Sequence, residues 1–217
     1  MNKLFLTSTG LPKETRGSFL SLLDKSPSQV LVCHIPTAAD PEEDKWFIEA
    51  SKDEFKEIGL NFFDLDLKSE NKDSLIRKLA PVDVIYINGG NTFYLLDWVR
   101  RSGFDKVVPK LLEEGKIYVG ASAGTVLAGP DIAIAGWDPD GDKNTVGLTN
   151  LCGLNLVPFA IAPHFVEKDR KLLEEKSKGV SYAVVALNNK QVILARDEKI
   201  SIVGVGEKVF FNNFKET

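Results

Sequence analysis

The stretch "YVGASAGTVLAG", residues 118–129, places a single serine among small residues where an apolar run gives way to a helical one. Ser122 stands in the pattern G-x-S-x-G, with Gly120 before it and Gly124 after it. At a turn from strand to helix, this pattern is typical of α/β hydrolytic enzymes, which hold an exposed nucleophile there. The N–H of Ala123, at the start of the helix, would then face the oxyanion formed during attack. The alternative is that Ser122 caps the helix and the glycines only permit close packing.

A serine hydroxyl needs a neighbouring base, and the chain has two histidines, His34 and His164. His164 follows the apolar run "FAIAP", so we expect it at the carboxyl end of a strand, where ligand sites of α/β sheets form. His34 and Cys33 lie inside the apolar run "QVLVCHI", and we interpret both as buried core residues. Cys33 and Cys152 lack the spacing of a metal site or a disulfide framework. We therefore predict His164 as the base, and we expect no metal and no cofactor.

A second candidate element is "INGGNTFYLL", residues 87–96, where a predicted strand ends in Gly89-Gly90 and a helix begins at Asn91 or Thr92. Paired glycines let backbone N–H groups approach a ligand closely, and the start of a helix adds positive potential. We predict that this element binds substrate through a carboxylate, a phosphate or an oxyanion. The alternative is a tight turn with an Asn or Thr cap. The spacing fits no nucleotide-binding loop.

Apolar runs and helical stretches alternate along most of the chain. This alternation predicts a mainly parallel sheet with helices on both faces. The predicted strands cover residues 3–9, 29–35, 60–67, 82–89, 116–122 and 156–165, and the predicted helices cover residues 12–24, 40–59, 73–79, 91–101, 104–114 and 166–178. Asp40 as a cap and Pro41 at the first helical position place the start of the second helix. In the first helix, the side chains expected to point inward are Phe19, Leu20, Leu22 and Leu23.

Two regions depart from this alternation. Residues 131–154 are rich in Gly, Asp, Pro and Asn, so they form either a functional loop or a small β excursion. We predict that residues 135–150, which follow the elbow helix, border the mouth of the active site. The tail, residues 181–211, predicts antiparallel strands joined by turns at Asn188-Asn189 and Asp197-Glu198. Without an internal repeat or a linker, the chain is expected to be a single α/β domain over residues 1–217.

The composition narrows the classes of function. The 217 residues include 27 Lys and Arg against 31 Asp and Glu, with a net charge of −4. The basic residues are scattered, so a nucleic-acid partner is not expected. The apolar start is too short for a signal peptide and no run of 18 apolar residues occurs, so we expect no membrane association and a cytoplasmic protein. A monomer or a homodimer is the expected state.

Three motifs taken together carry a family resemblance. In this order, "YINGGNTFYLL", "GASAGT" and "IAPHF" resemble the peptidase E (aspartyl dipeptidase) and cyanophycinase family of serine peptidases, over nearly the whole chain. The resemblance implies a class I glutamine-amidotransferase-like (flavodoxin-like) fold, a three-layer sandwich with antiparallel strands at its C-terminal end. It also implies that Ser122 is the nucleophile and His164 its base. Gly90 and Ala123 would supply the oxyanion-hole N–H groups, and Gly89 would shape the loop.

The third catalytic residue departs from the family pattern. The aspartyl dipeptidases of this family follow an apolar strand with a Glu that orients the histidine, whereas "AVVAL" here runs into Asn188-Asn189-Lys190. Asn189 stands at the Glu position. An Asn carbonyl accepts the histidine N–H in Cys-His-Asn enzymes, so we predict that Asn189 orients His164. The alternatives are Asn188, Asp138, Asp140, Asp142 and Asp169.

Specificity follows from the same resemblance. The dipeptidases of this family cleave after an N-terminal aspartate, which an arginine downstream of the histidine grips. Arg170 in "EKDRKLLEE" lies in the matching region, and its alternative role is that of a solvated helix charge. The sequence therefore predicts a serine dipeptidase that acts on short peptides. The alternatives are a non-catalytic relative that binds a peptide or small molecule, and an α/β-hydrolase esterase, which needs a histidine that the tail lacks.

Overall fold

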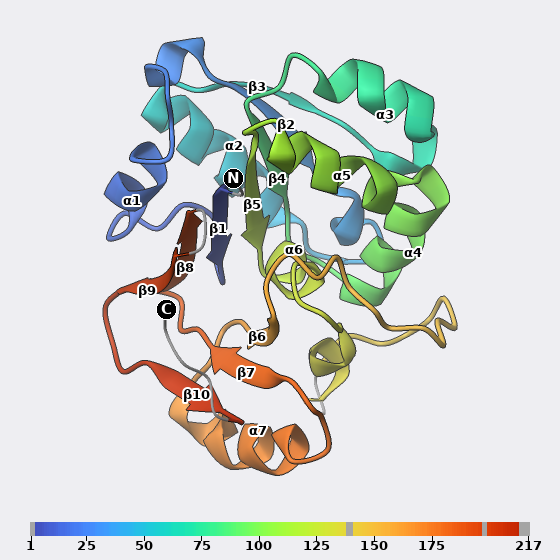
Figure 1. Ribbon diagram of the computed structural model, residues 1–217, viewed down its shortest axis with the longest axis vertical. Helices are drawn as coiled ribbons and strands as arrows, with labels where there is room; N and C mark the ends of the chain where they lie inside the picture. Colours follow the sequence, from blue (N-terminus) through green and yellow to red (C-terminus); the bar gives the residue numbers. More distant parts are fainter. Residues whose placement is uncertain (1–2, 138–140, 197–198, 213–217) are drawn as a thin grey trace.

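The central sheet organises the molecule, which a computed structural model describes over residues 3–137, 141–196 and 199–212. Figure 1 shows this sheet with helices on both sides. The strands from β3 to β1 are parallel neighbours, and β8 and β9 extend the sheet in the antiparallel sense. The seven strands lie in the order β3 (Asn61–Asp64), β2 (Leu31–Ile35), β4 (Val84–Ile87), β5 (Ile117–Ala121), β1 (Lys3–Thr7), β8 (Gln191–Arg196) and β9 (Lys199–Gly204).

Two hydrophobic cores lie on opposite faces of the sheet, because successive side chains of a strand point to opposite sides. Phe5 of β1 packs with Phe19 and Phe55, which come from α1 (Arg16–Leu20) and α2 (Trp46–Ile58). Leu4 and Leu6 point into the other core. That core is covered by α3 (Lys72–Leu79), α4 (Thr92–Ser102), α5 (Phe104–Glu113) and α6 (Ala123–Leu127). The expected three-layer α/β architecture is confirmed.

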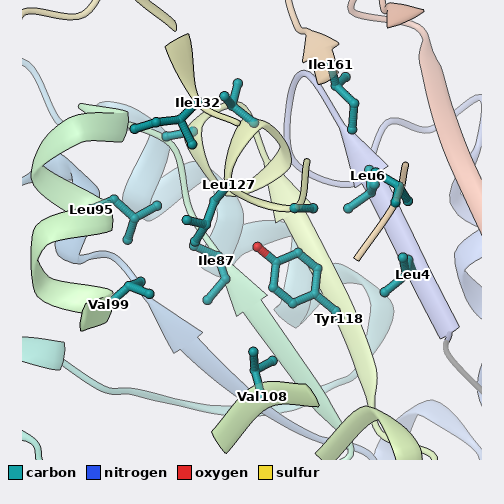
Figure 2. Close-up of a cluster of buried hydrophobic side chains, with 14 of the residues drawn as sticks. Leu4, Leu6, Ile87, Leu95, Val99, Val108, Tyr118, Leu127, Ile132 and Ile161 are labelled. Carbon is teal, nitrogen blue, oxygen red and sulfur yellow. The ribbon is translucent and has the colours of Figure 1, made fainter. Parts of the chain in front are cut away.

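A buried tyrosine connects the larger core to the elbow helix. Figure 2 shows Ile87 and Tyr118 of the sheet close to Leu95 and Val99 of α4. Tyr118 is fully buried, and its hydroxyl donates a hydrogen bond of 2.6 Å to the carbonyl of Gly124 in α6. An unpaired buried hydroxyl costs about 1–3 kcal/mol, so this hydrogen bond helps to fix the position of α6 against the sheet.

The strand order determines which loops meet. The strands β3, β2, β4 and β5 lie side by side in this order. When β2 is counted as the first strand, this is the 2-1-3-4 order of flavodoxin-like sheets, and β1 lies next to β5. In parallel strands the carboxyl ends share one edge of the sheet. The residues after β1, β4 and β5 therefore converge at that edge, where ligands bind in open α/β sheets.

A second sheet of three strands differs from the expectation of a single sheet. It has the order β10 (Val209–Phe211), β7 (Ala183–Ala186) and β6 (Phe159–Ala162), and α7 (Arg170–Ser177) lies beside it at the bottom of Figure 1. β7 pairs with β6 in parallel and with β10 in the antiparallel sense, whereas β8 pairs with β1. The predicted pairing across the Asn188-Asn189 turn is therefore wrong, because this turn carries the chain from one sheet to the other. The predicted Asp197-Glu198 turn lies outside the described residues.

The helix α2 begins later than predicted. Residues 37–39 form a 3-10 turn, and α2 starts at Trp46 rather than at Asp40. The Asp40 carboxylate does not cap a helix, because it accepts a hydrogen bond from the Tyr94 hydroxyl and pairs with Lys68. Both partners are distant in sequence. A local pattern therefore could not reveal that the Asp40 carboxylate is already occupied.

The helix α1 is also shorter than predicted, with five residues from Arg16 to Leu20. Gly17 within it lowers helix propensity by about 1 kcal/mol relative to alanine. Phe19 and Leu22 point inward as expected, whereas Leu20 is 36% exposed. Across the described parts of the chain, no helix is both long and apolar enough to cross a membrane.

Candidate active site

The serine turn has a backbone shape that few residues adopt. Ser122 joins β5 to α6 with φ 49° and ψ −108°, a strained conformation for a residue with a Cβ. A Cβ on Gly120 would lie 2.5 Å from the carbonyl oxygen of Gly124, and a Cβ on Gly124 would strike the carbonyl of Ile87. The Ser122 side chain makes no capping hydrogen bond to α6. The two glycines are thus required by close packing, and the hydroxyl is left for another partner.

A threonine on α6 ties this turn to β1. The Thr125 Oγ1 accepts a hydrogen bond of 2.9 Å from the Thr7 N–H, and it lies 2.6 Å from the carbonyl oxygen of Gly120. The Ser122 N–H donates to the Thr7 carbonyl at 2.9 Å. Thr125 is completely buried. The role of Thr125 was missed in the sequence, where it appeared only as part of an elbow motif.

The partner of the Ser122 hydroxyl is His164. The His164 Nε2 lies 2.9 Å from the Ser122 Oγ, although His164 follows β6 in the second sheet and Ser122 follows β5 in the central one. His164 has a φ of 60°, and its backbone N–H donates to the Ser8 Oγ at 3.0 Å. The Ser8 hydroxyl donates in turn to the Leu187 carbonyl at 3.0 Å. Ser8, just after β1, therefore connects the segment after β6, which carries His164, to the segment after β7, which contains Leu187.

Asn189 lies on the other side of the imidazole. Its Oδ1 is 2.9 Å from the His164 Nδ1. An amide oxygen only accepts hydrogen bonds, so the Nδ1 carries the proton and the Nε2 is left as an acceptor for the Ser122 hydroxyl. This is the tautomer that a serine nucleophile requires. The structure thus brings the three predicted residues into one hydrogen-bonded line.

The aspartates considered as alternatives to Asn189 lie elsewhere or outside the described residues. The Asp142 carboxylate accepts from the Thr92 N–H at 2.7 Å, and the Asp169 carboxylate accepts from the Val166 N–H at 3.2 Å. Asp138 and Asp140 are outside the described residues. Asn188 uses its Oδ1 for the Lys190 N–H. Among the described residues, only Asn189 and Ser122 make side-chain hydrogen bonds to the His164 ring.

The glycine loop after β4 borders the same serine. A Cβ on Gly89 would lie 3.2 Å from the Ser122 Cβ, and a Cβ on Gly90, whose φ is 129°, would strike the Ala38 carbonyl. The Gly89 N–H is bonded to the Asn88 Oδ1 at 2.8 Å. Within the described chain, neither the Gly90 nor the Ala123 N–H has a hydrogen-bond partner. These two groups are the donors available to an oxyanion beside Ser122.

Asn91 and Thr92 contribute to this edge in different ways. The Asn91 Oδ1 caps α4 by accepting from the Tyr94 N–H at 2.9 Å, and its Nδ2 donates to the Lys143 carbonyl at 3.1 Å. The side chain of Asn91 is therefore occupied within the fold. Thr92 lines a cavity next to Ser122, while its backbone N–H holds Asp142.

Two cavities meet at Ser122 and His164. The first, of about 330 Å³, has Glu42, Glu54 and Asp142 as its acidic lining residues. The second, of about 380 Å³, has Lys168 as its only Lys or Arg among the described residues. Four described residues of the segment predicted to border the site line these cavities, namely Ala135, Trp137, Gly141 and Asp142. In residues 131–154 the described part has a 3-10 turn at Ala133–Gly136 and one isolated bridge, so the segment is a loop.

Burial changes the acidity of two of these carboxyls. It raises the pKa of Asp142, an effect that the hydrogen bonds from Thr92 only partly offset. Burial also raises the pKa of Glu42, and repulsion from the Asp142 charge adds to this. A cationic group placed between the two carboxylates in the first cavity would stabilise their ionised forms.

Arg170, the predicted specificity residue, is engaged elsewhere. Its guanidinium pairs with Glu167 at 2.6 Å and with Glu207 at 2.8 Å, and it lies 5.7 Å from the ring centre of Phe165. It is absent from the described lining of both cavities, whereas Lys168 lines the second. The geometry agrees with the solvated-charge alternative, and the contact between Arg170 and substrate stays a prediction.

The two cysteines and His34 are the remaining positions for which the sequence made a prediction. Cys33 and His34 are completely buried, as expected, and Cys152 is exposed. Over the ranges that the structure describes, no three His, Cys, Asp or Glu side chains form a group able to hold a metal ion.

Comparison with known proteins shows which family and which relatives this chain is similar to. The model of peptidase family S51 matches residues 4–203. An uncharacterized peptidase of Listeria innocua is 35% identical over 205 residues, which cover 92% of this chain and 95% of the relative. The peptidase E of Streptomyces coelicolor is 36% identical over 100 residues, which cover 46% of this chain and 39% of the relative.

A solved structure is similar over nearly the full length. It is a crystal structure of a candidate peptidase E protein from Listeria monocytogenes, with a TM-score of 0.82 and 32% identity. The alignment covers 95% of this chain and all of the other. The arrangement of strands and helices described above is therefore shared with that protein.

Proposed function

Because the chain belongs to peptidase family S51, and is therefore a peptidase, we propose that it hydrolyses short peptides through an acyl-enzyme on Ser122. The observation that carries this proposal is the line of contacts from the Ser122 Oγ through the His164 ring to the Asn189 Oδ1, with 2.9 Å at each step. Each atom in this line has the donor or acceptor role that nucleophilic catalysis needs.

The reaction follows from these roles. The Ser122 Oγ attacks the peptide carbonyl carbon while the His164 Nε2 takes the hydroxyl proton. The developing oxyanion accepts hydrogen bonds from the Gly90 and Ala123 N–H groups. When the C–N bond breaks, His164 returns the proton to the leaving amine. A water molecule, deprotonated by His164, then attacks the ester carbon, and the proton passes back to the Ser122 oxygen as the acid leaves.

Asn189 acts on the histidine in this scheme. Its carbonyl holds the Nδ1–H and so keeps the ring in the tautomer that faces Ser122. A neutral amide stabilises the imidazolium less than a carboxylate would, because it carries only a partial charge. The proposed enzyme therefore has a complete geometry with a weaker third member.

The two cavities favour a substrate that carries a positive and a negative charge near its N-terminus. The carboxylates of the first cavity suit an α-ammonium group. In the second cavity Lys168 suits an acidic side chain, and the two aspartates that also line it, Asp142 and Asp169, accept hydrogen bonds from backbone N–H groups. We therefore infer a dipeptidase that prefers an N-terminal aspartate, with Lys168 rather than Arg170 nearest to the aspartate carboxylate. The small volumes, about 330 and 380 Å³, favour short peptides.

The test combines labelling and hydrolysis. A fluorophosphonate probe is expected to modify wild-type protein at Ser122 and to leave Ser122→Ala unmodified, as read by mass spectrometry of the intact chain and its peptides. Asp-Ala is expected to be cleaved faster than Ala-Ala and Lys-Ala. A folded wild-type protein that is neither labelled nor active on any of the three would favour the non-catalytic binding alternative.

A further inference from the structure

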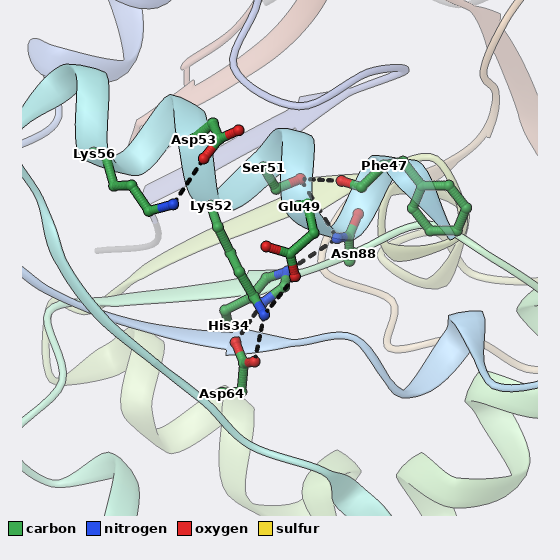
Figure 3. Close-up of polar contacts among 9 residues, drawn as sticks. All are labelled: His34, Phe47, Glu49, Ser51, Lys52, Asp53, Lys56, Asp64 and Asn88. Atoms are coloured by element: carbon green, nitrogen blue, oxygen red, sulfur yellow. Dashed lines mark hydrogen bonds and ion pairs between the residues drawn. The ribbon is translucent and has the colours of Figure 1, made fainter. Parts of the chain in front are cut away.

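His34 is a completely buried histidine that the proposed reaction does not use, and it has a partner on each ring nitrogen. Figure 3 shows it among a group of polar contacts that includes Lys52, Asp64 and Asn88. Its Nδ1 lies 2.9 Å from the Asp64 Oδ1, and its Nε2 lies 2.9 Å from the Asn88 Nδ2. Asn88 is the residue directly before the Gly89-Gly90 loop.

The charges around His34 determine the direction of these hydrogen bonds. Burial raises the pKa of Asp64, but hydrogen bonds from Lys52 and His34 together outweigh it and lower the pKa, so Asp64 is an ionised acceptor. Burial lowers the pKa of His34, although hydrogen bonding to Asp64 opposes this, and the ring is neutral. The His34 Nδ1 therefore carries the proton, and the His34 Nε2 is an acceptor.

Asn88 is oriented as a consequence. Its NH₂ group must face the His34 Nε2, so its Oδ1 faces the other way and accepts the Gly89 N–H at 2.8 Å. With the amide reversed, an NH₂ would face the Gly89 N–H, and neither of these donors would have an acceptor. The order of donors and acceptors thus runs without interruption from Asp64 to the glycine loop.

The loop is held on both sides of the Gly90 N–H. The Gly89 N–H is fixed by Asn88, and the Asn91 N–H donates to the Ala38 carbonyl at 2.8 Å. Between these two anchors, the Gly90 N–H has no partner among the described residues, and Gly90 lines the same cavity as Ser122. A rotation of the peptide group between Asn88 and Gly89 would therefore displace the Gly90 N–H.

We propose that His34 is a positioning residue for the reaction, which acts through Asn88 to hold the Gly90 N–H toward the oxyanion formed at Ser122. This inference rests on the proposed function. Volume alone would not require a histidine at this position. The ring lies 5.7 Å from Phe55 and 5.6 Å from Tyr86, measured between ring centres, so phenylalanine would suit the same apolar surroundings.

Other charged groups near His34 come from α2 and are accounted for. Lys52 pairs with Asp64 at 2.8 Å and with Glu49 at 3.0 Å. The Ser51 hydroxyl lies 3.4 Å from the Asn88 Nδ2 and 3.1 Å from the Tyr86 hydroxyl. The Ser51 Oγ is thus a second, longer acceptor for the Asn88 NH₂, and the His34 Nε2 is the nearer one at 2.9 Å.

The experiment measures the second-order rate constant for fluorophosphonate labelling of Ser122, together with kcat and KM on Asp-Ala. His34→Phe removes both ring nitrogens at similar volume. It is expected to slow labelling and lower kcat by about tenfold or more while KM changes less than twofold, because an oxyanion donor acts mainly in the transition state. His34→Gln, whose amide oxygen can accept from Asn88, is expected to recover at least threefold of the lost rate.

Two further variants make the result decisive. Cys33→Ala removes a buried side chain from the same strand on its opposite face, and it is expected to lower the melting temperature without changing the labelling rate. Asp64→Asn alters a half-exposed residue, so it tests the chain of contacts even where His34→Phe does not fold, and it is expected to slow labelling in the same direction.

The outcomes separate the two proposals. Failure of the wild type to be labelled at Ser122 contradicts the proposed function, and the positioning role falls with it. If the wild type is labelled, labelling of folded His34→Phe at the wild-type rate overturns the positioning role alone. Where His34→Phe does not fold, a wild-type rate for Asp64→Asn overturns it instead. Equal losses in His34→Gln and His34→Phe, matched by Cys33→Ala, would also reduce His34 to a packing role.

Discussion

The Oδ1 of Asn189 lies 2.9 Å from the Nδ1 of His164, and the two residues reach this contact from the segments that follow two neighbouring strands of the smaller sheet. Asn189 follows β7 on the turn that leads into the central sheet, and His164 follows β6. Both side chains are exposed, so packing does not hold the pair together. The hydrogen bonds to Asn189 and Ser122 therefore set the orientation of the imidazole.

Substituting Asn189 tests this orientation. Asn189→Ala is expected to lower kcat/KM on Asp-Ala by about 100-fold or more, because the ring loses the acceptor that selects its tautomer. Asn189→Asp is expected to keep or raise the rate, since a carboxylate also stabilises the imidazolium. Asn188→Ala, which alters the neighbouring turn residue, is the matched control. A wild-type rate for Asn189→Ala would show that another group orients the histidine.

The strained backbone of Ser122 predicts a gain in stability when the side chain is lost. A φ of 49° with ψ of −108° suits glycine far better than residues with a Cβ. Ser122→Gly is therefore expected to unfold with a free energy about 1 kcal/mol higher than that of Ser122→Ala, while both are inactive. Urea denaturation at equilibrium measures the difference. Equal stability of the two variants would show that the elbow stores no strain.

Lys168 and Arg170 offer a matched pair for specificity. Lys168→Ala is expected to raise KM for Asp-Ala by about tenfold, or about 1.4 kcal/mol, with little effect on Ala-Ala. Arg170→Ala is expected to leave both substrates within twofold, because its guanidinium is held in surface ion pairs with Glu167 and Glu207 and is absent from the described lining of both cavities. Steady-state kinetics on the two dipeptides decides. A selective loss in Arg170→Ala instead would support the role that the family resemblance implied.

Asp142 predicts a dependence of stability on pH. Burial raises its pKa in the folded protein above the ordinary value of about 3.9. The folded state therefore binds the proton more tightly than the unfolded state. The resulting stabilisation is complete below the unfolded pKa and is lost as the pH rises through the folded pKa.

The variant Asp142→Asn removes this charge and keeps an oxygen for the Thr92 N–H. It is expected to be at least as stable as the wild type at pH 7, and the advantage is expected to shrink as the pH falls toward 4. Asp142→Ala loses the acceptor and is expected to cost about 1 kcal/mol. Thermal melts of the three proteins across this pH range provide the measurement. A growing advantage of Asp142→Asn at low pH would contradict the raised pKa.

The sequence predicted the elements that depend on local chemistry. Ser122 between two glycines, the apolar strands and the cap at Asn91 follow from patterns within a few residues. Predictions failed where a side chain has a distant partner. Asp40 resembles a helix cap, but Tyr94 and Lys68 engage its carboxylate.

The same reason explains what was missed in the site. His34 was predicted to be buried, and it is, but its contacts are with Asp64 and Asn88, 30 and 54 residues away. The pairing of β7 with β6 rather than with β8 likewise depends on contacts that no local pattern encodes. Asn189 was identified only because the family resemblance left a position without its acid.

Because the proposed site is divided between two sheets, its activity is expected to depend on how those sheets pack together. Ser122 follows a strand of the central sheet and His164 follows a strand of the smaller one, and the Ser8 hydroxyl just after β1 is hydrogen-bonded to both the His164 N–H and the Leu187 carbonyl. A shift of about 1 Å between the sheets would stretch the Ser122–His164 contact beyond hydrogen-bonding distance, and the larger core, which contains residues of both sheets, opposes such a shift. The proposed catalytic contact is thus a property of the packed pair of sheets, which neither sheet possesses alone.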